Sequence, residues 1–304
     1  MSCIEVCHRH FIVFNSNHPV LKVFFSVLLF FVFGVLLIGC GSQTATPSHS
    51  ENSSQDRLSL IQERGKLIAG VKFDSKPFGY LDEKGNVVGY DIDLLKEIAK
   101  HLLGHADAVE FKQVLSSTRV FDINSGQVDL VAATMTITPE REEIIDFSEP
   151  YFVAGQAVMV PVQSPVQHLS DLAGKKTLFV IGATSEANMK SKQPQTKLVG
   201  FKTSLDAFSA LKAGRGDAFT TDDTILAGLM QGNCDFRLLS ERLSSEPYGL
   251  GFKQDLESHT TKSLREKINT ILTTLQKDGT LEKLQKKWVV SGTVAAGCPT
   301  PKSN

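Results

Sequence analysis

The sequence predicts an α/β protein with mostly parallel sheets, because short apolar strands and amphipathic helices alternate along most of its length. Residues 67–71 form an apolar run of strand length, and the apolar residues of segment 92–103 recur at helical spacing. The second half repeats this alternation, with a strand at 178–181 and an amphipathic helix at 264–275. A chain of 304 residues is long enough for one large domain or two modest lobes.

The first half adds further elements in close order. They are a turn at 83–86, a strand at 109–111, a short helix that begins after Ser116 or Ser117 and is closed by Gly126, and a strand at 130–133. A helix start follows at Thr138-Pro139-Glu140. Threonine accepts free backbone N–H groups there, proline is pre-set for the first helical position, and glutamate favours the positive helix end.

The second half contains the remaining predicted elements. They are a helix capped by Ser204 and ending near 214, a strand at 218–219, a helix that opens at Asp222, a strand at 248–252 and a helix at 281–288.

The N-terminal region has the pattern of a secretory signal. Residues 20–39 are almost wholly apolar, follow positively charged residues and end in Leu-Ile-Gly directly before Cys40. This ending resembles a bacterial lipobox, in which the cysteine thiol takes a lipid and becomes the new N-terminus. We therefore expect a lipoprotein signal peptide over 1–39 and a flexible tether over 40–57. An uncleaved transmembrane helix is the alternative, and the polar residues 41–44 favour the lipobox.

Charge and cysteine content limit the classes of function. The 32 Lys and Arg against 33 Asp and Glu give a net charge of −1, so no bulk positive field is present to bind nucleic acid. Cys234 and Cys298 are the internal thiols that remain after Cys40, and an oxidising compartment allows a disulfide between them. Their spacing matches no zinc pattern, so we expect no metal site.

Six segments in order carry a family resemblance: GVKFD at 70–74, PFGY at 77–80, GYDIDL at 89–94, GQVDL at 126–130, TMTITPER at 134–141 and DFSEPY at 146–151. Together they resemble the extracellular solute-binding proteins, family 3, of ABC transporters for polar amino acids. The likeness runs from about residue 64 to 288.

This resemblance implies a type II periplasmic-binding-protein fold, in which two lobes close over a ligand. Each lobe would be a mostly parallel sheet flanked by helices, and two hinge strands near 152–155 and 246–248 would join them. The implied boundaries are 58–153 plus 248–290 for the first lobe, 154–247 for the second lobe, and 291–304 for a C-terminal tail.

The resemblance also implies how the ligand's α-carboxylate is held. Arg141 occupies the family position that clamps this group, and a guanidinium fork matches carboxylate geometry. Thr136 and the backbone around Thr134 would add donors. The alternative is an exposed arginine in a charged first turn, but an arginine there gains nothing from the positive helix end.

The second lobe would supply Asp222 for the α-ammonium, and Thr184 and Ser185 as hydroxyl and backbone N–H donors. Each of the three has a plainer interpretation as a helix cap. Asp223 is equally able to cap, which would leave Asp222 for the ligand.

Selectivity would come from Lys72 and Arg119, which look like the glutamate/aspartate branch of the family. With Arg141 they offer three positive charges against Asp222, which suits a ligand with two carboxylates and one ammonium. A solvated strand-end lysine and a surface helix arginine are the alternatives. Glutamate or aspartate is therefore the expected ligand, and glutamine is the second choice.

The function implied by the resemblance is binding without chemistry. We expect a monomeric, lipid-anchored protein on the periplasmic or extracytoplasmic face of the membrane, which passes its amino acid to an ABC transporter permease and needs no cofactor. A ligand-presenting receptor is an alternative. A dehydratase-like enzyme on the same fold is another, and Glu149 is the one acid at the cleft edge that the sequence offers it.

Overall fold

The computed structural model describes residues 56–255 and 260–289. The predicted signal peptide, Cys40, most of the tether, and the tail with Cys298 lie outside the described residues. Among the described residues, no helix combines the length and the apolar character that a membrane span requires.

The first lobe is built on a five-stranded sheet in the order β5-β1-β6-β15-β7. The first three strands of that order run parallel, and β15 runs antiparallel to both of its neighbours. The strands are β1 (Leu67–Val71), β5 (Val109–Gln113), β6 (Leu130–Ala132), β7 (Ile145–Phe147) and β15 (Gly251–Lys253). The helices are α1 (Arg57–Arg64), α2 (Tyr90–Leu103), α3 (Arg119–Asn124), α4 (Pro139–Glu142), α8 (Lys262–Lys277) and α9 (Thr280–Trp288).

The second lobe repeats this plan, with the sheet order β11-β10-β12-β9-β13. Again three strands run parallel, and β9 is antiparallel to both of its neighbours. The strands are β9 (Gln156–Pro161), β10 (Lys176–Val180), β11 (Lys197–Phe201), β12 (Ala218–Asp222) and β13 (Phe236–Leu238). Its helices are η2 (Leu169–Leu172), α5 (Ser185–Lys192), α6 (Ser204–Lys212) and α7 (Asp223–Met230).

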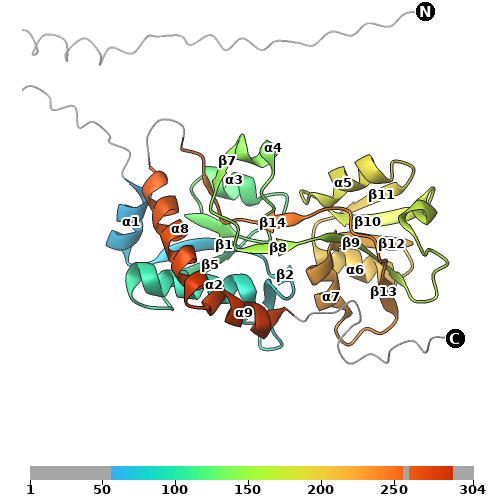
Figure 1. Ribbon diagram of the computed structural model, residues 1–304, viewed down its shortest axis with the longest axis horizontal. Coiled ribbons are helices and arrows are strands. Elements are labelled where there is room, and N and C mark those ends of the chain that lie inside the picture. The colour runs from blue at the N-terminus through green and yellow to red at the C-terminus, as the bar shows by residue number, and fades with distance from the viewer. Residues whose placement is uncertain (1–55, 256–259, 290–304) are drawn as a thin grey trace, which may run out of the picture. The chain divides into compact units, whose positions relative to one another are not determined.

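Two antiparallel strands, β8 (Phe152–Ala154) and β14 (Glu246–Tyr248), join the lobes. Figure 1 shows them running side by side between the two sheets. Aromatic rings pack around this hinge: the ring of Phe78 lies 5.0 Å from that of Phe152 and 5.2 Å from that of Tyr248, centroid to centroid. Edge-on contacts of this kind stabilise the hinge beyond the area they bury.

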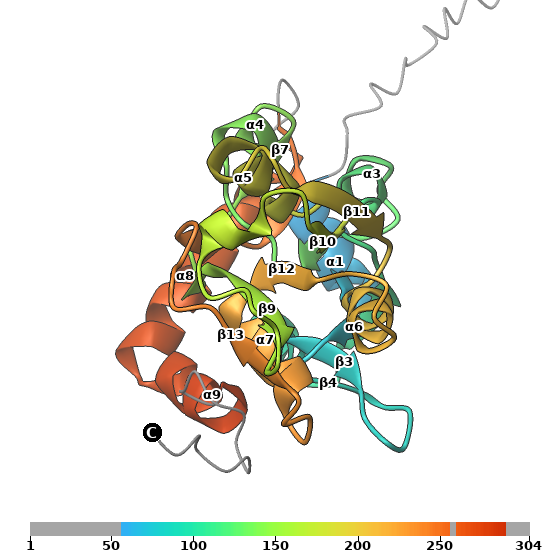
Figure 2. The ribbon, with the colours of Figure 1, turned by 90° about the vertical axis from the view of Figure 1, so that its right-hand side faces the viewer.

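A small antiparallel sheet extends the first lobe toward the second. It consists of β2 (Asp74–Ser75), β3 (Gly79–Leu81) and β4 (Val87–Val88). Figure 2 shows it next to α6 of the second lobe, and β2 contacts that helix. The segment directly after β1 therefore reaches the interface between the lobes.

The structure corrects three predicted elements. The short helix expected after Ser116 or Ser117 begins at Arg119, with Thr118 at the cap position. The strand expected at 248–252 is two strands, because Gly249 leaves the hinge pair and donates its N–H to Met135 O at 3.0 Å before β15 begins. Ser204 is the first residue of α6 and not its cap, since the hydroxyl of Thr203 accepts from Asp206 N. The helix start at Thr138 is confirmed, because its side chain accepts from Arg141 N.

Candidate functional site

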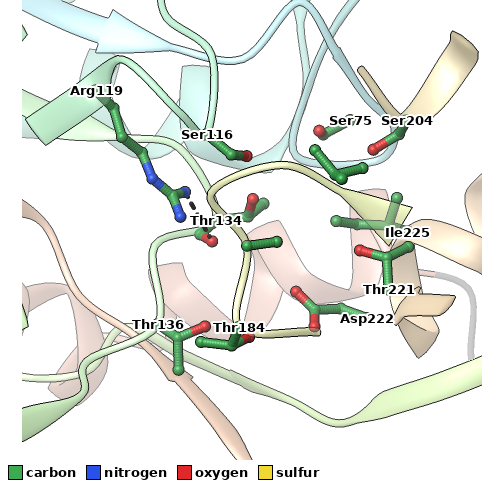
Figure 3. A pocket seen from close by; sticks show the side chains of 12 residues that line it. Ser75, Ser116, Arg119, Thr134, Thr136, Thr184, Ser204, Thr221, Asp222 and Ile225 are labelled. Carbon is green, nitrogen blue, oxygen red and sulfur yellow. Dashed lines mark hydrogen bonds between the residues drawn. The ribbon is translucent and has the colours of Figure 1, made fainter. Parts of the chain in front are cut away.

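A small polar cavity lies between the two lobes (Figure 3). It is lined by Ser75, Ser116, Arg119, Thr134, Thr136, Val180, Ala183, Thr184, Ser204, Thr221, Asp222 and Ile225. Seven of these side chains carry a hydroxyl, and one positive and one negative group face each other across them. Such a site suits a small, polar, charged molecule.

Thr134 and Thr136 come from the turn that follows β6, and both line the cavity as predicted. Thr134 has φ of 47°, a left-handed conformation that side chains other than glycine rarely adopt. Its backbone N–H donates to Asp91 Oδ2 at 3.3 Å, which holds this turn. Strained backbone held in this way is common where a protein shapes a ligand site.

Arg141 lies beside the cavity and is not among its lining residues. Its guanidinium donates to Thr136 O at 2.7 Å and, across the cleft, to Gly182 O at 3.0 Å. Burial lowers the pKa of Arg141, and the nearby Glu246 and Asp222 carboxylates act in the opposite direction. Arg141 therefore faces the interface between the lobes and is not the solvated first-turn arginine of the alternative.

Arg119 is 2% exposed and lines the cavity, so it is not a surface helix residue. One terminal nitrogen donates to Ala133 O at 2.6 Å and Thr134 O at 3.3 Å, and the other donates to Gly182 O at 3.5 Å. Burial and the positive charge of Arg141 lower the pKa of Arg119 to about 9. The Gly182 carbonyl thus accepts from both arginines and draws the lobes together.

Lys72 is buried, but it does not line the cavity. Its ammonium pairs with Asp74 Oδ1 at 3.2 Å and donates to Ser116 Oγ at 3.3 Å. Burial lowers the pKa of Lys72, and the charge of Asp74 acts against this shift. The structure therefore corrects the count of three free positive charges, because the charge of Lys72 already has a partner.

Asp222 ends β12, and its carboxylate lines the cavity and makes no cap hydrogen bond to α7. The Tyr248 hydroxyl donates to it instead. Asp223 Oδ1 accepts from Thr224 N at 2.7 Å, so Asp223 binds a backbone N–H of the first turn of α7. Burial raises the pKa of Asp222 to about 7, although the Tyr248 hydrogen bond lowers it.

Thr184 and Ser185 differ in their positions. Thr184 lines the cavity, and its hydroxyl donates to Glu246 Oε2 at 2.9 Å. Ser185 is buried behind it, does not line the cavity, and its hydroxyl has no hydrogen-bond partner among the described residues. The structure thus brings one of these two predicted residues to the cavity.

Several important acids were missed by the sequence reasoning. Asp91, Glu246 and Asp74 are buried close to the site. Asp91 lies in the GYDIDL segment, where an acid inside an otherwise apolar helix face is a usable signal. Glu149 is exposed and does not line the cavity, so the acid proposed for an enzyme lies elsewhere.

The described residues contain no cluster of His, Cys, Asp and Glu that would hold a metal ion. Cys234 is disulfide-bonded. Its expected partner Cys298 lies outside the described residues, so the pairing itself stays a prediction.

Two α/β lobes joined by paired hinge strands and closed over a polar cavity define a solute-binding protein of the type II periplasmic-binding-protein fold. The chain belongs to the bacterial extracellular solute-binding proteins, family 3. The sequence model of this family matches residues 67–291.

Two curated relatives are similar over most of this chain. One is the ABC transporter glutamine-binding protein GlnH of Bacillus subtilis, which is 38% identical. The alignment covers 88% of this chain and 98% of GlnH. Another is a glutamine-binding protein of Geobacillus stearothermophilus, which is 39% identical over 73% of this chain and 88% of that protein. A solved structure of an ancestral arginine-binding protein bound to glutamine is 40% identical, with a TM-score of 0.69. The match covers 74% of this chain and 98% of that chain.

Proposed function

We propose that this protein binds glutamine in the cavity between its lobes and delivers it to the permease of an ABC importer. Lipidation at Cys40 would hold it at the outer face of the cell membrane. The observation that carries the choice of ligand is that buried carboxylates accompany every predicted positive charge. The similarity to two glutamine-binding proteins supports the same choice.

The charges around the site favour a ligand with a neutral side chain. Lys72 is paired with Asp74. Burial lowers the pKa of Arg141, and the charges of Glu246 and then Asp222 act against this shift. The charge of Arg119 lowers the pKa of Asp91, so these two groups interact. Three cations therefore stand beside four buried acids, and a further carboxylate would not be matched by a spare positive charge.

The α-groups of the ligand have complementary partners. Arg141 at the cavity edge is proposed to bind the α-carboxylate, together with Thr136. Asp222 is proposed to bind the α-ammonium. An amide side chain both donates and accepts, which suits a wall of hydroxyl groups that do the same.

Glutamate or aspartate is the second candidate, and one observation favours it. Arg119 lines the cavity directly, with its guanidinium toward the hydroxyl-lined space (Figure 3). Because burial raises the pKa of Asp91 to about 7, the negative charge that accompanies Arg119 is incomplete at neutral pH. The order expected from the sequence is thus reversed in this proposal, with glutamine first.

Calorimetry on the full chain tests the proposal, after unfolding and refolding in detergent to remove carried-over ligand. The titrants are glutamine, glutamate, aspartate, asparagine, arginine and histidine at pH 8. We expect tight binding of glutamine, at least about tenfold tighter than of glutamate. Tighter binding of glutamate would reverse the order of the two candidates, and no binding of any titrant would refute the proposal.

Two variants separate the roles of the arginines. Arg141→Met is expected to weaken every amino acid by more than about a hundredfold, because the α-carboxylate is common to all of them. Arg119→Met is expected to act mainly on the preference among side chains. Equal losses for all ligands in both variants would contradict this division.

We propose no reaction for this cavity. Conversion of a prephenate-like substrate to product by the purified protein would support the dehydratase alternative instead. Genes for a permease and an ATP-hydrolysing subunit beside this one would favour uptake over the receptor alternative.

A further inference from the structure

One peptide unit of the cavity wall is held by opposite charges from its two sides. The Ala133 carbonyl accepts from the Arg119 guanidinium at 2.6 Å. The N–H of the same peptide, that of Thr134, donates to Asp91 Oδ2 at 3.3 Å. The peptide therefore links a buried cation to a buried anion, with its own dipole aligned favourably with both charges.

Asp91 is placed behind the cavity and does not touch the space within it. It lies in the first turn of α2 and is fully buried, and Thr134 stands between it and the cavity. Its other oxygen, Oδ1, accepts from the Tyr151 hydroxyl at 2.9 Å. Asp91 is thus held by two hydrogen bonds, one of which comes from the peptide whose carbonyl accepts from Arg119.

We propose that Asp91 is the counter-ion of Arg119 and determines the charge of the ligand side chain that the cavity prefers. Asp91 compensates Arg119 through the Ala133–Thr134 peptide, so the guanidinium acts on the ligand as a hydrogen-bond donor with little net charge. A neutral amide then binds better than a carboxylate. This inference rests on the proposed function and names the residue that gives it glutamine over glutamate.

Electrostatics in a buried site make this effect large enough to measure. Charges separated by several ångströms still interact strongly enough, at the effective dielectric of a protein interior, to change an affinity by about tenfold. Removal of the negative charge of Asp91 leaves Arg119 with Asp222 as the remaining acid that acts on it. Because Asp222 is proposed to bind the ligand ammonium, the loss of Asp91 favours an anionic side chain and leaves a neutral one nearly unaffected. The α-groups are common to both ligands, so the ratio of the two dissociation constants isolates the side-chain effect.

Asp91→Asn is the decisive variant, measured by calorimetry with glutamine and glutamate at pH 8. We expect the preference to move toward glutamate by about tenfold or more. Tyr151→Phe is the matched control, because it removes a hydrogen bond from the same carboxylate and keeps the ionisable group. Because this hydrogen bond lowers the pKa of Asp91, its loss is expected to protonate part of the carboxylate at pH 8 and to move the preference toward glutamate by less than Asp91→Asn does.

A double-mutant cycle tests the pairing itself. In the background of Arg119→Met, the change Asp91→Asn is expected to shift the preference by much less than it does alone. A purely structural role for Asp91 predicts equal weakening of both ligands in every background, and this result would overturn the inference. If no amino acid binds the unsubstituted protein, the proposed function fails first.

The unsubstituted protein provides a second measurement if Asp91→Asn does not fold. The pKa of Asp91 is about 7, so the preference is expected to move toward glutamate between pH 8 and pH 6. The groups that face Asp91 are Tyr90, Tyr151, Tyr248 and Arg119. The raised tyrosine pKa values and the arginine pKa of about 9 keep these groups from titrating in that range. Asp222 also has a pKa of about 7 and acts on Arg119, so the shift in preference must persist in Asp222→Asn. A preference that is flat with pH would contradict the inference.

Discussion

At the scale of single residues, burial changes the ionisation of Asp222, the group that we propose binds the ligand ammonium. Asp222 has a pKa of about 7 because it leaves water, and the charges of Glu246 and Asp223 add to this. The Tyr248 hydrogen bond and the charge of Arg119 act in the opposite direction without offsetting burial. A carboxylate in this state is half protonated near neutral pH, and it binds an ammonium only when it is ionised.

Glutamine binding is therefore expected to weaken as pH falls below about 7. The bound ammonium lowers the pKa of Asp222, so binding releases a proton, and the affinity decreases by up to tenfold for each pH unit below 7. Calorimetry at pH 8, 7, 6 and 5.5 measures the affinity, and its repetition in buffers of different ionisation enthalpy measures the number of protons released. Asp91 titrates in the same range, so the slope must persist in Asp91→Asn and disappear in Asp222→Asn. An affinity that is constant with pH would contradict this role.

At the scale of elements, one carboxylate connects β2 of the first lobe to α6 of the second. Asp74 Oδ2 accepts from Ser204 N at 2.8 Å, at the first residue of the helix, where the backbone N–H groups and the helix dipole favour a negative charge. Its other oxygen is the partner of Lys72. Asp74 therefore holds a buried cation and a contact between the lobes at the same time.

Asp74→Asn is expected to destabilise the protein by about 3 kcal/mol, because it leaves the buried Lys72 ammonium without its partner. The double variant Lys72→Met with Asp74→Asn removes both charges and is expected to recover most of this loss. Thermal and urea unfolding of the ligand-free protein measure the difference. Equal destabilisation in the single and double variants would show that the ion pair is not the cause. Glu110→Gln, which changes an exposed pair with Lys66, serves as the neutral control.

Elements with strong local signals were predictable, whereas the charge pairs of the site were not. The helix start at Thr138 and Pro139 depends on neighbouring residues alone, and it is confirmed. Lys72 looked free in the sequence because its partner Asp74 is a neighbour in the chain with no visible reason to turn toward it. Asp91 and Arg119 meet only through a peptide that belongs to a third segment. Pairings of this kind depend on tertiary structure, so local sequence patterns do not reveal them.

At the scale of the whole molecule, glycines permit the close approach of the two lobes. A Cβ on Gly182 would lie 2.6 Å from Ser116 O, and one on Gly228 would lie 2.4 Å from Lys76 O. Both of these oxygens belong to the backbone of the first lobe, so they do not move aside as a flexible side chain would. The lobes can therefore close over the cavity only while these positions lack a side chain.

Gly228→Ala is expected to hold the lobes apart and to weaken glutamine binding by at least about tenfold, because the ligand must then bind a state that closes poorly. Gly228 lies inside α7, where alanine is a better helix former, so the resistance to unfolding is expected to stay the same or to rise slightly. Small-angle X-ray scattering with saturating glutamine measures closure through the radius of gyration.

Gly214→Ala is the matched control with the opposite pattern. Its φ of 68° makes alanine cost about 1–2 kcal/mol, yet nothing stands within 4 Å of the added Cβ atom. The control should therefore lose stability and keep its affinity. If Gly228→Ala closes on glutamine like the unsubstituted protein, the closed arrangement of the lobes does not depend on this contact.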